Sequence, residues 1–446
     1  MKIETLHLEN FKKFRKASLK LHPQWTLLVG ENGCGKTTWL DALAVALGIW
    51  LVKPPDPELR NSGRSLLRSE IHLAARREGD RTLFQPITPA TITAVGTLQG
   101  QPLQWTRENL HGGSTSNKKS KIALEKIQNI YREDLEGHRQ VCPIFVYYGA
   151  GRAWLPSNER KQTKTHLNGP ARRWDAFYDC FQERIRFSEV QTWFLKEMIA
   201  SAHLKQMRPG FEIVKRAILS CIPDTDDAWF DSDLDQIVLS IHGQPQPFHN
   251  LSAGQGMMLA MVADLAIKAI TQNAHLIPPS MHGASEDHLD QVLRQTPGIV
   301  LIDELDVHLH PRWQRNIAAD LKRTFPSLQF IATSHSPQVI GELPRDQVVL
   351  IQDDKNFHPS VALGADSNWI LDHVMKGAHS QNQRSAFLQN AVELALDDGD
   401  LPAAKEHLQQ LKALLQEDTA ATVGLEAALA TLERLNRSKT SRRGPP

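Results

Sequence analysis

WTLLVGENGCGKTTWLDALAVALGIWL, residues 25–51, combines three successive patterns. WTLLV is a short, continuous apolar run, which is typical of a buried strand. GENGCGKTT fits the pattern G-x-x-x-x-G-K-[ST], and the residues after it repeat apolar side chains at helical spacing. A strand, a glycine-rich loop and a helix in this order provide the context that a phosphate-binding loop requires. The segment therefore predicts an α/β fold built around a phosphate site.

The loop supplies several groups that suit a nucleoside triphosphate. Its glycines let backbone N–H groups curl around phosphates, and the helix N-terminus adds a positive partial charge. We expect Lys36 to reach the β- and γ-phosphates and the Thr37 hydroxyl to ligate Mg²⁺. ATP and Mg²⁺ are the cofactors that this pattern implies. The positions that we assign to nucleotide binding are Gly30, Asn32, Gly33, Cys34, Gly35, Lys36, Thr37 and Thr38.

Two adjacent acids follow a second apolar strand, GIVLI, at Asp303 and Glu304. Carboxylates at a buried strand end cost several kcal/mol in desolvation unless a cation or water takes them up. We expect Asp303 to serve the metal and Glu304 to orient and polarise the attacking water. The strand LQFIATSHS then places His335 at its C-terminal end, where we interpret it as a sensor of the γ-phosphate.

A second potential anion site lies in HNLSAGQGMMLAMV, residues 249–262. Ser252 and Gly254 are small residues at the start of an apolar helix, and a helix N-terminus can hold a phosphate. Since the chain already has a phosphate loop far upstream, this second cradle needs a separate explanation.

In this order, GENGCGKTT, LSAGQ, LIDELD and TSHS resemble the ABC ATPase superfamily, and LSAGQ looks like its signature motif. In that superfamily, the signature of one subunit covers the γ-phosphate that another subunit holds. The resemblance therefore implies a nucleotide-sandwich dimer and leaves open a higher oligomer. It assigns Ser252, Gly254 and Gln255 to the neighbour's ATP. Asp306 matches the position from which the family communicates across the dimer.

Shorter strings narrow the resemblance. LHLENFKKF and DELDVHLHP look like the SMC/RecF branch, and YYGAGR, ATSHSP and GADSNWIL resemble the PtuA ATPases of Septu and retron-linked Septu systems. That family implies regulation of an HNH-type nuclease partner in anti-phage defence. The alternatives are a RecF/SMC-like repair ATPase acting directly on DNA, a transporter's nucleotide-binding subunit and a non-hydrolysing nucleotide-gated scaffold.

Composition limits the class of protein. The formal net charge is +1, so a nucleic-acid partner would have to meet local basic patches. The four cysteines form no C-x-x-C, which indicates a reducing cytoplasm without a disulfide frame. No apolar run approaches the ~18–20 residues needed to span a bilayer, and the N-terminus does not resemble a secretory signal. We therefore expect a cytoplasmic protein without a membrane partner.

The patterns predict four regions. Residues 1–110 form an N-terminal ATPase lobe with a β hairpin turning at residues 99–101, and residues 111–235 form a mobile loop and a helical insertion. Residues 236–365 form the C-terminal ATPase lobe, and residues 366–446 form a helical extension. The fold class is α/β: an ABC/SMC-type head with a parallel-core mixed sheet, an antiparallel β subdomain and a helical C-terminal extension.

Several other features leave alternatives open. His308 and His310 suggest a metal site or, with fewer assumptions, a structural turn before Pro311. DDGD, residues 397–400, mimics a nuclease's acid pair but sits between helical patterns, which favours Asp400 as an N-cap and no nuclease centre in this chain. Cys34 is either a redox-sensitive thiol or a small filler residue.

Nucleic-acid contact rests on two basic stretches that could follow phosphates in DNA or RNA. Solvated surface is the alternative for both stretches, and Arg152 is either a phosphate contact or a structural arginine. The basic residues are Lys118, Lys119, Lys121, Arg152, Arg160, Lys161, Lys164, Arg172 and Arg173. The aromatic residues from Trp174 to Trp193 have helical spacing, which favours core packing over base stacking.

Overall fold

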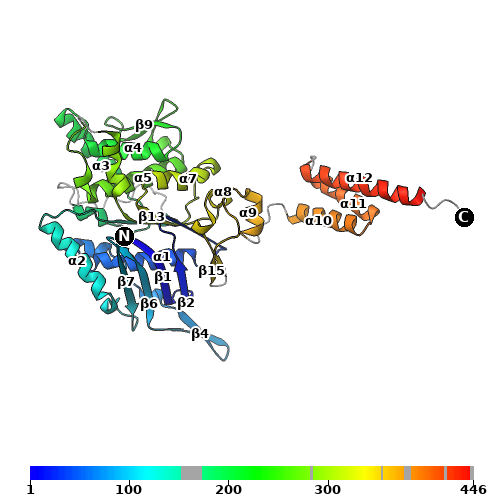
Figure 1. The fold of residues 1–446 in the computed structure, drawn as a ribbon, viewed down its shortest axis with the longest axis horizontal. Helices are drawn as coiled ribbons and strands as arrows, with labels where there is room; N and C mark the ends of the chain where they lie inside the picture. Colours follow the sequence, from blue (N-terminus) through cyan, green and yellow to red (C-terminus); the bar gives the residue numbers. More distant parts are fainter. Residues whose placement is uncertain (152–172, 282–284, 353–354, 376–382, 416–418, 442–446) are drawn as a thin grey trace. The chain divides into compact units, whose positions relative to one another are not determined.

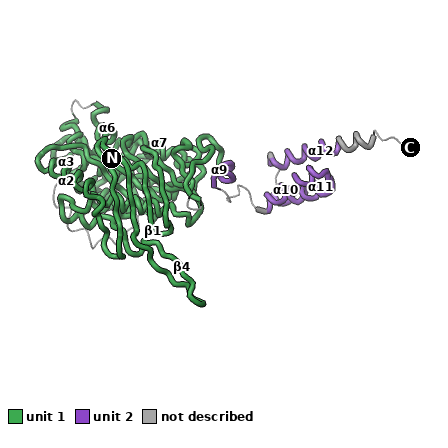
Figure 2. Tube along the Cα trace, turned by 60° about the horizontal axis from the view of Figure 1, so that its bottom comes forward, with its two compact units in different colours: residues 1–367 green, residues 368–446 purple. Residues whose placement is uncertain are grey.

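The computed structural model describes residues 1–446 except 152–172, 282–284, 353–354, 376–382, 416–418 and 442–446. The chain divides into two compact units, residues 1–367 and 368–446 (Figure 2). Arg152, Arg160, Lys161, Lys164 and Arg172 lie outside the described residues.

A six-stranded sheet forms the centre of the first unit, in the order β15-β14-β3-β13-β12-β8. All neighbouring strands in it are parallel except β14 and β15, which are antiparallel. Five of its strands are almost continuously buried and apolar, as expected of a parallel sheet that is covered on both faces. The strands are β3 (Trp25–Val29), β8 (Ile144–Tyr148), β12 (Gly298–Ile302), β13 (Leu328–Thr333), β14 (Val348–Gln352) and β15 (Lys355–Phe357).

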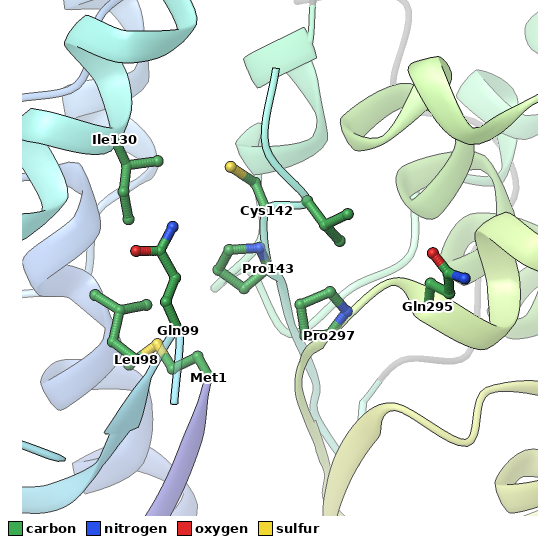
Figure 3. A pocket seen from close by; sticks show the side chains of 9 residues that line it. Met1, Leu98, Gln99, Ile130, Cys142, Pro143, Gln295 and Pro297 are labelled. Atoms are coloured by element: carbon green, nitrogen blue, oxygen red, sulfur yellow. The ribbon is translucent and has the colours of Figure 1, made fainter. Parts of the chain in front are cut away.

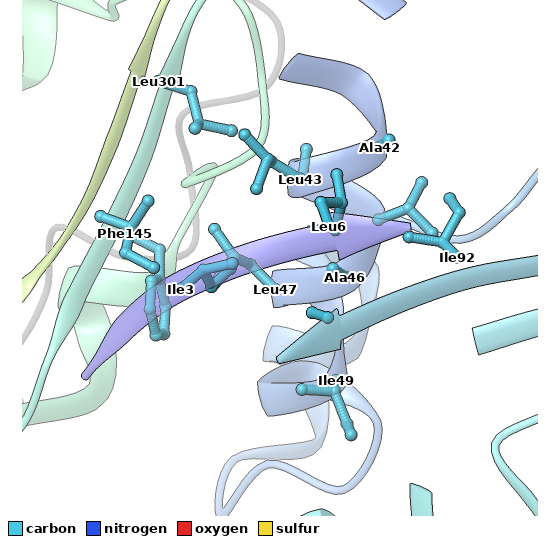
Figure 4. Close-up of a cluster of buried hydrophobic side chains, with 14 of the residues drawn as sticks. Ile3, Leu6, Ala42, Leu43, Ala46, Leu47, Ile49, Ile92, Phe145 and Leu301 are labelled. Carbon is cyan, nitrogen blue, oxygen red and sulfur yellow. The ribbon is translucent and has the colours of Figure 1, made fainter. Parts of the chain in front are cut away.

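An antiparallel sheet lies on one side of the parallel sheet, with α1 (Lys36–Leu47) packed between them (Figures 1 and 4). Helix α1 is mostly apolar and is buried on all sides from Trp39 to Leu47, so it is stable only when both sides are covered. Leu43 and Leu47 lie among Ile3, Ile92 and Phe145 in one hydrophobic cluster. The antiparallel strands, in the order β2-β1-β6-β7, are β1 (Lys2–Phe11), β2 (Phe14–Lys20), β6 (Ala90–Leu98) and β7 (Gln101–Asn109).

Helices cover the opposite face of the parallel sheet, and α5 contacts β8 there (Figure 1). The helices of this unit are α1, α2 (Lys121–Leu135), α3 (Phe187–Leu204), α4 (Pro209–Cys221), α5 (Ala253–Gln272), α6 (Glu286–Gln295), α7 (Pro311–Thr324) and α8 (Pro337–Gly341). The remaining strands form a hairpin, β4 (Leu73–Glu78) with β5 (Arg81–Pro86), and a small sheet of β9 (Thr225–Asp231), β10 (Gln236–Ile241) and β11 (Gln244–Pro247).

The second unit is helical, with a hydrophobic core between three helices. It contains α9 (Ser367–His373, beginning one residue before the division), α10 (Gln383–Asp397), α11 (Leu401–Leu415) and α12 (Ala420–Ser441). The carboxylate of Asp400 accepts from the backbone N–H of Ala403 at 3.1 Å, as the N-cap reading of DDGD predicts. The αα-hairpin that the sequence predicts is therefore confirmed.

Three expectations need correction. The helical pattern from Arg172 does not begin a long helix: Arg173–Phe177 is a short 3-10 helix, Asp179 has a left-handed φ of 51°, and α3 begins only at Phe187. The loop of residues 111–121 is not simply mobile, because Glu108 and Ser116 exchange two backbone hydrogen bonds across it. The expectation that no apolar run is long enough to span a bilayer is wrong for α5, which is long and apolar enough by length and composition. However, 72% of its most apolar 18-residue window is buried inside the protein.

Candidate nucleotide site

The carboxyl ends of four parallel strands meet at one edge of the central sheet. β3 runs into the glycine-rich loop, β12 into Asp303, β13 into Ser334 and β8 into Gly149. Their register is continuous, because Ile302 pairs with both Ala332 and Tyr148. Ligands of open α/β sheets bind beyond the carboxyl ends of the strands, which makes this edge the candidate site.

The glycine-rich loop depends on two glycines with left-handed backbone conformations. Gly33 has φ 79°, and Gly35, which caps α1, has φ 103°. A side chain at Gly35 would place its Cβ 2.7 Å from the ring of Phe14. Asn32 and Thr37 are exposed, while Cys34 and Thr38 are half-buried. The loop therefore presents polar groups at the mouth of the site while its base packs against β2.

Lys36 lies inside the curve of the loop. Its ammonium donates to the carbonyl oxygens of Gly30 at 2.9 Å and Glu31 at 3.0 Å. Burial lowers the pKa of Lys36 from its ordinary value, and the thiol of Cys34 and the carboxylate of Asp303 act in the opposite direction. A phosphate group could replace the two carbonyl acceptors, so the ammonium is positioned for an anion.

Asp303 is buried, at 5% exposure, and joins the acid pair to the loop. Its Oδ2 accepts from the hydroxyl of Thr37 at 2.9 Å, and its Oδ1 accepts from the hydroxyl of Thr333 at 2.6 Å. Its backbone N–H donates to the carbonyl of Tyr148 at 2.7 Å. A carboxylate beside a hydroxyl is the hard oxygen donor set that suits Mg²⁺. The two residues expected to hold the metal are thus in direct contact.

Glu304 occupies an uncommon backbone conformation, with φ 50°. Its N–H donates to the hydroxyl of Thr333 at 2.7 Å, so one hydroxyl supports both members of the acid pair. A non-glycine residue with positive φ costs about 1–3 kcal/mol and persists only where its surroundings hold it. The conformation turns the chain sharply where β12 ends, directly after Asp303.

Asp306 holds the loop that carries His335. Its Oδ1 accepts from the hydroxyl of Ser334 at 2.6 Å and from the backbone N–H of His335 at 3.2 Å. Burial, and next the positive charge of Lys36, lower the pKa of His335, so the ring is neutral near pH 7. These contacts lie within one chain, and the role in communication between subunits that the family resemblance implies for Asp306 stays a prediction.

The signature segment begins α5. The hydroxyl of Ser252 accepts from the N–H of Gln255 at 3.3 Å, and the Gln255 amide oxygen accepts from the N–H of Ser252 at 2.9 Å, which forms a capping box. A Cβ at Gly254 would lie 2.5 Å from the carbonyl oxygen of His308. In the described part of the chain, these hydrogen bonds link Ser252 and Gln255 to each other rather than to the phosphate loop. Both side chains are exposed or partly exposed.

Helix α5 carries a charged pair in an otherwise apolar sequence, and this pair ties the helix to β8. Asp264 and Lys268 form an ion pair at 3.0 Å, and the hydroxyl of Tyr148 donates to Asp264 at 2.7 Å. The backbone of the same Tyr148 holds Asp303. One tyrosine therefore links the signature helix to the acid pair.

Sequence reasoning missed four residues of this site: Lys13, Phe14, Tyr148 and Thr333. Lys13 donates to the loop carbonyls of Gly33 at 3.2 Å and Cys34 at 3.0 Å. The available signals were the Lys-Lys-Phe string after β1, the second tyrosine of YYGAGR and the threonine of ATSHS. None of these strings indicates which distant residue it will contact.

The structure also shows the contacts of His310, Lys119 and Arg173, for which the sequence left alternatives open. The ring of His310 accepts from the N–H of Arg312 and caps α7, and the described residues contain no group of three or more metal-ligating side chains. Lys119 pairs with the buried Glu108 at 2.8 Å. Arg173 pairs with Asp134 and donates to the carbonyl of Gln272 at 2.8 Å, so it braces the fold.

A cavity of about 280 Å³ lies elsewhere in the first unit (Figure 3). Met1, Cys142, Pro143 and Pro297 are among its lining residues, and none of the residues assigned to nucleotide binding lines it. It is therefore separate from the candidate nucleotide site.

Comparisons with known proteins relate this chain to families of ATPases. The AAA domain family matches residues 5–224, and a family described as "AAA domain, putative AbiEii toxin, Type IV TA system" matches residues 223–341. The retron Ec83 probable ATPase of Escherichia coli is 34% identical over 94% of this chain and 84% of its own length. The Septu protein PtuA of Bacillus thuringiensis is 33% identical over 89% of each chain. A solved SMC head bound to the winged-helix domain of ScpA covers 81% of this chain and 99% of its own, with 14% identity and a TM-score of 0.45.

Proposed function

The chain belongs to the family of defence-associated ATPases that includes the retron Ec83 and Septu PtuA proteins, and from this premise we propose that two copies close around ATP to control a partner nuclease. The observation that carries the proposal is the contact between Thr37 and Asp303, 266 positions apart in sequence, beside a buried lysine. This arrangement supports binding of a magnesium–triphosphate at the edge of the parallel sheet.

The chemistry within one chain follows from the roles of its side chains. Lys36 and the loop N–H groups bind the phosphates, and Thr37 and Asp303 hold Mg²⁺, which when bound neutralises phosphate charge. Glu304 orients and polarises the attacking water. His335, neutral near pH 7, can donate a hydrogen bond to the γ-phosphate without adding a second positive charge beside Lys36.

The second copy supplies the other half of the site. The exposed hydroxyl of Ser252 and the N–H groups at the start of α5 form an anion-binding helix terminus, which the chain's own loop does not use. A neighbour's γ-phosphate fits this terminus, so ATP bridges two chains and hydrolysis removes the bridge. The exposed position of Ser252 supports this reading.

The nuclease partner is inferred from family membership and from the residues that are described. The acidic string DDGD, residues 397–400, joins α10 to α11, and its Asp400 accepts from the backbone N–H of Ala403 at the start of α11. A partner of the HNH type, encoded alongside, would then supply the cutting activity. If purified chain alone showed DNA-stimulated ATP turnover, a repair ATPase acting directly on DNA would be the better assignment.

The experiment that tests the closure is the Glu304→Gln variant with ATP and Mg²⁺, followed by light scattering. We expect ATP binding without turnover and an ATP-dependent increase in mass that is lost when ATP is withdrawn. Adding Ser252→Arg to this variant should preserve ATP binding but prevent the ATP-dependent dimer. A Glu304→Gln protein that binds ATP without any change in mass would refute the shared site.

A further inference from the structure

Helix α10 of the second unit has two apolar stripes. Leu388, Val392 and Ala395 form the first stripe and pack into the core shared with α11 and α12. Phe387 and Leu394 belong to the second and are 69% and 64% exposed. Two large, exposed apolar side chains on a helix that is already packed suggest that this helix has another binding surface.

The exposed side chains belong to a regular stripe. Residues three and four apart lie on one face of a helix, so Arg384, Phe387, Ala391, Leu394 and Asp398 lie along one line. Asp398 follows the last residue of α10, but its N–H still donates to the carbonyl of Leu394 at 2.9 Å, so the helical path continues to it. We call these five residues the α10 stripe.

We propose that the α10 stripe binds the α10 stripe of a second copy of this chain, with the two helices antiparallel. Ala391 lies at the centre of the stripe and is small enough to let two helices approach closely. Arg384 and Asp398 each lie seven residues from Ala391, or about 10.5 Å at 1.5 Å per residue. An antiparallel pair that crosses at Ala391 therefore places each Arg384 opposite the other copy's Asp398.

The same geometry brings the apolar side chains together. Phe387 and Leu394 lie on opposite sides of Ala391, so Phe387 of one copy meets Leu394 of the other. A surface that matches itself after a half-turn is what a two-fold symmetric dimer requires. This self-complementarity, of charge as well as apolar contact, favours a second copy over a different partner. The interface is separate from the ATP site, so together the two contacts could link chains into assemblies larger than a dimer.

The test uses the full chain carrying Lys36→Ala, so that nucleotide cannot bridge two heads, and measures its mass by sedimentation velocity at micromolar concentrations. We expect a concentration-dependent dimer. Phe387→Glu should raise its dissociation constant at least about tenfold. Val423→Glu is the matched control, because Val423 is also apolar, 53% exposed and in the same unit, but lies on α12. This control should dimerise normally.

A charge exchange separates an intermolecular contact from an effect on folding. Arg384→Asp alone should weaken the dimer, and adding Asp398→Arg should restore it. The two positions are fourteen residues apart, about 21 Å along one helix, so they can pair only between chains. A chain that stays monomeric, or a Phe387→Glu variant that dimerises normally, would overturn the proposal. Loss of a co-purifying nuclease with unchanged self-association would also overturn it and assign the stripe to that partner.

Discussion

Replacing Lys268 by Met should strongly destabilise the first unit, because it leaves the carboxylate of Asp264 in the interior without its cation. The side chains of Lys268 and Asp264 are only 15% and 19% exposed. Removing one partner of a buried ion pair typically costs about 3–5 kcal/mol. Asp264 would keep the hydrogen bond from Tyr148, so we expect the lower end, about 3 kcal/mol.

The assay is thermal unfolding followed by tryptophan fluorescence, which reports mainly on the first unit because Trp369 alone among the ten tryptophans lies in the second. Such a loss should lower the midpoint by roughly 5 °C in a unit of this size. The penalty should shrink at acidic pH, where the abandoned carboxyl can take up a proton and lose its charge.

Two companion variants make this prediction specific. Lys121→Met removes another lysine paired with an acid four residues away, but there the lysine is 82% exposed, and the expected cost is below about 1 kcal/mol. The double variant Lys268→Met with Asp264→Leu removes both charges and should recover most of the stability. If Lys268→Met unfolded at the wild-type temperature, or if the double variant were no better than the single, the pair would not be a buried charge network.

Four other predictions concern the nucleotide site. Lys36→Ala should abolish ATP binding in calorimetry, and unchanged affinity would contradict the phosphate-loop assignment. Gly254→Ala should lower the turnover number while preserving ATP affinity, because its Cβ would displace the start of α5 from the carbonyl of His308, 2.5 Å away; an unaltered turnover number would argue against this close approach. Thr333→Val should lower the turnover number roughly tenfold or more, because its hydroxyl contacts both Asp303 and Glu304 after β12. A wild-type turnover number in steady-state kinetics would show that this hydroxyl is not needed. Because the pKa of His335 is lowered in the folded state, its contribution to stability is complete above pH 6.5 and is lost as the pH falls through the folded-state pKa. Acid unfolding of His335→Gln should therefore begin at a lower pH than that of the wild type. Acid transitions that coincide for the two proteins would contradict this.

Local patterns predicted the parts of the fold that depend on neighbouring residues. The loop, the hairpin turn at Gln99 and Gly100, the parallel strands after which the acids lie, and the C-terminal αα-hairpin all carry short-range signals, and the structure confirms these elements. The resemblance to defence ATPases, drawn from short strings, is confirmed by relatives that align along most of the chain.

The aromatic segment after Arg172 shows where local reasoning fails. Trp174, Phe177 and Phe181 have helical spacing and are buried, but they pack around Phe145 through a 3-10 turn and irregular backbone. Asp179, with a left-handed φ, interrupts the path. Burial in a tertiary core can hold such residues in position without a continuous helix, and spacing alone does not distinguish the two cases.

The candidate site was predicted by residue type but not by its internal contacts. Asp303 and Thr37 were assigned to the metal from separate motifs, and only the parallel strand order brings them within 2.9 Å. Thr333 and Lys13 escaped detection because each acts on a segment that is remote in sequence. Such pairings depend on strand order, which the motifs do not encode.

The hydrogen bonds of Asp306 suggest how one subunit could respond to the binding of a second subunit. Its carboxylate holds the hydroxyl of Ser334 and the backbone of His335 through one oxygen, Oδ1, which accepts both hydrogen bonds. A neighbouring subunit that bound this carboxylate and turned Oδ1 away would loosen the loop that carries His335. The environment of the His335 ring would then differ between the monomer and the dimer. Nuclear magnetic resonance of His335 with and without ATP in the Glu304→Gln protein would detect this difference. An unchanged signal would mean that Asp306 contacts residues of its own chain only.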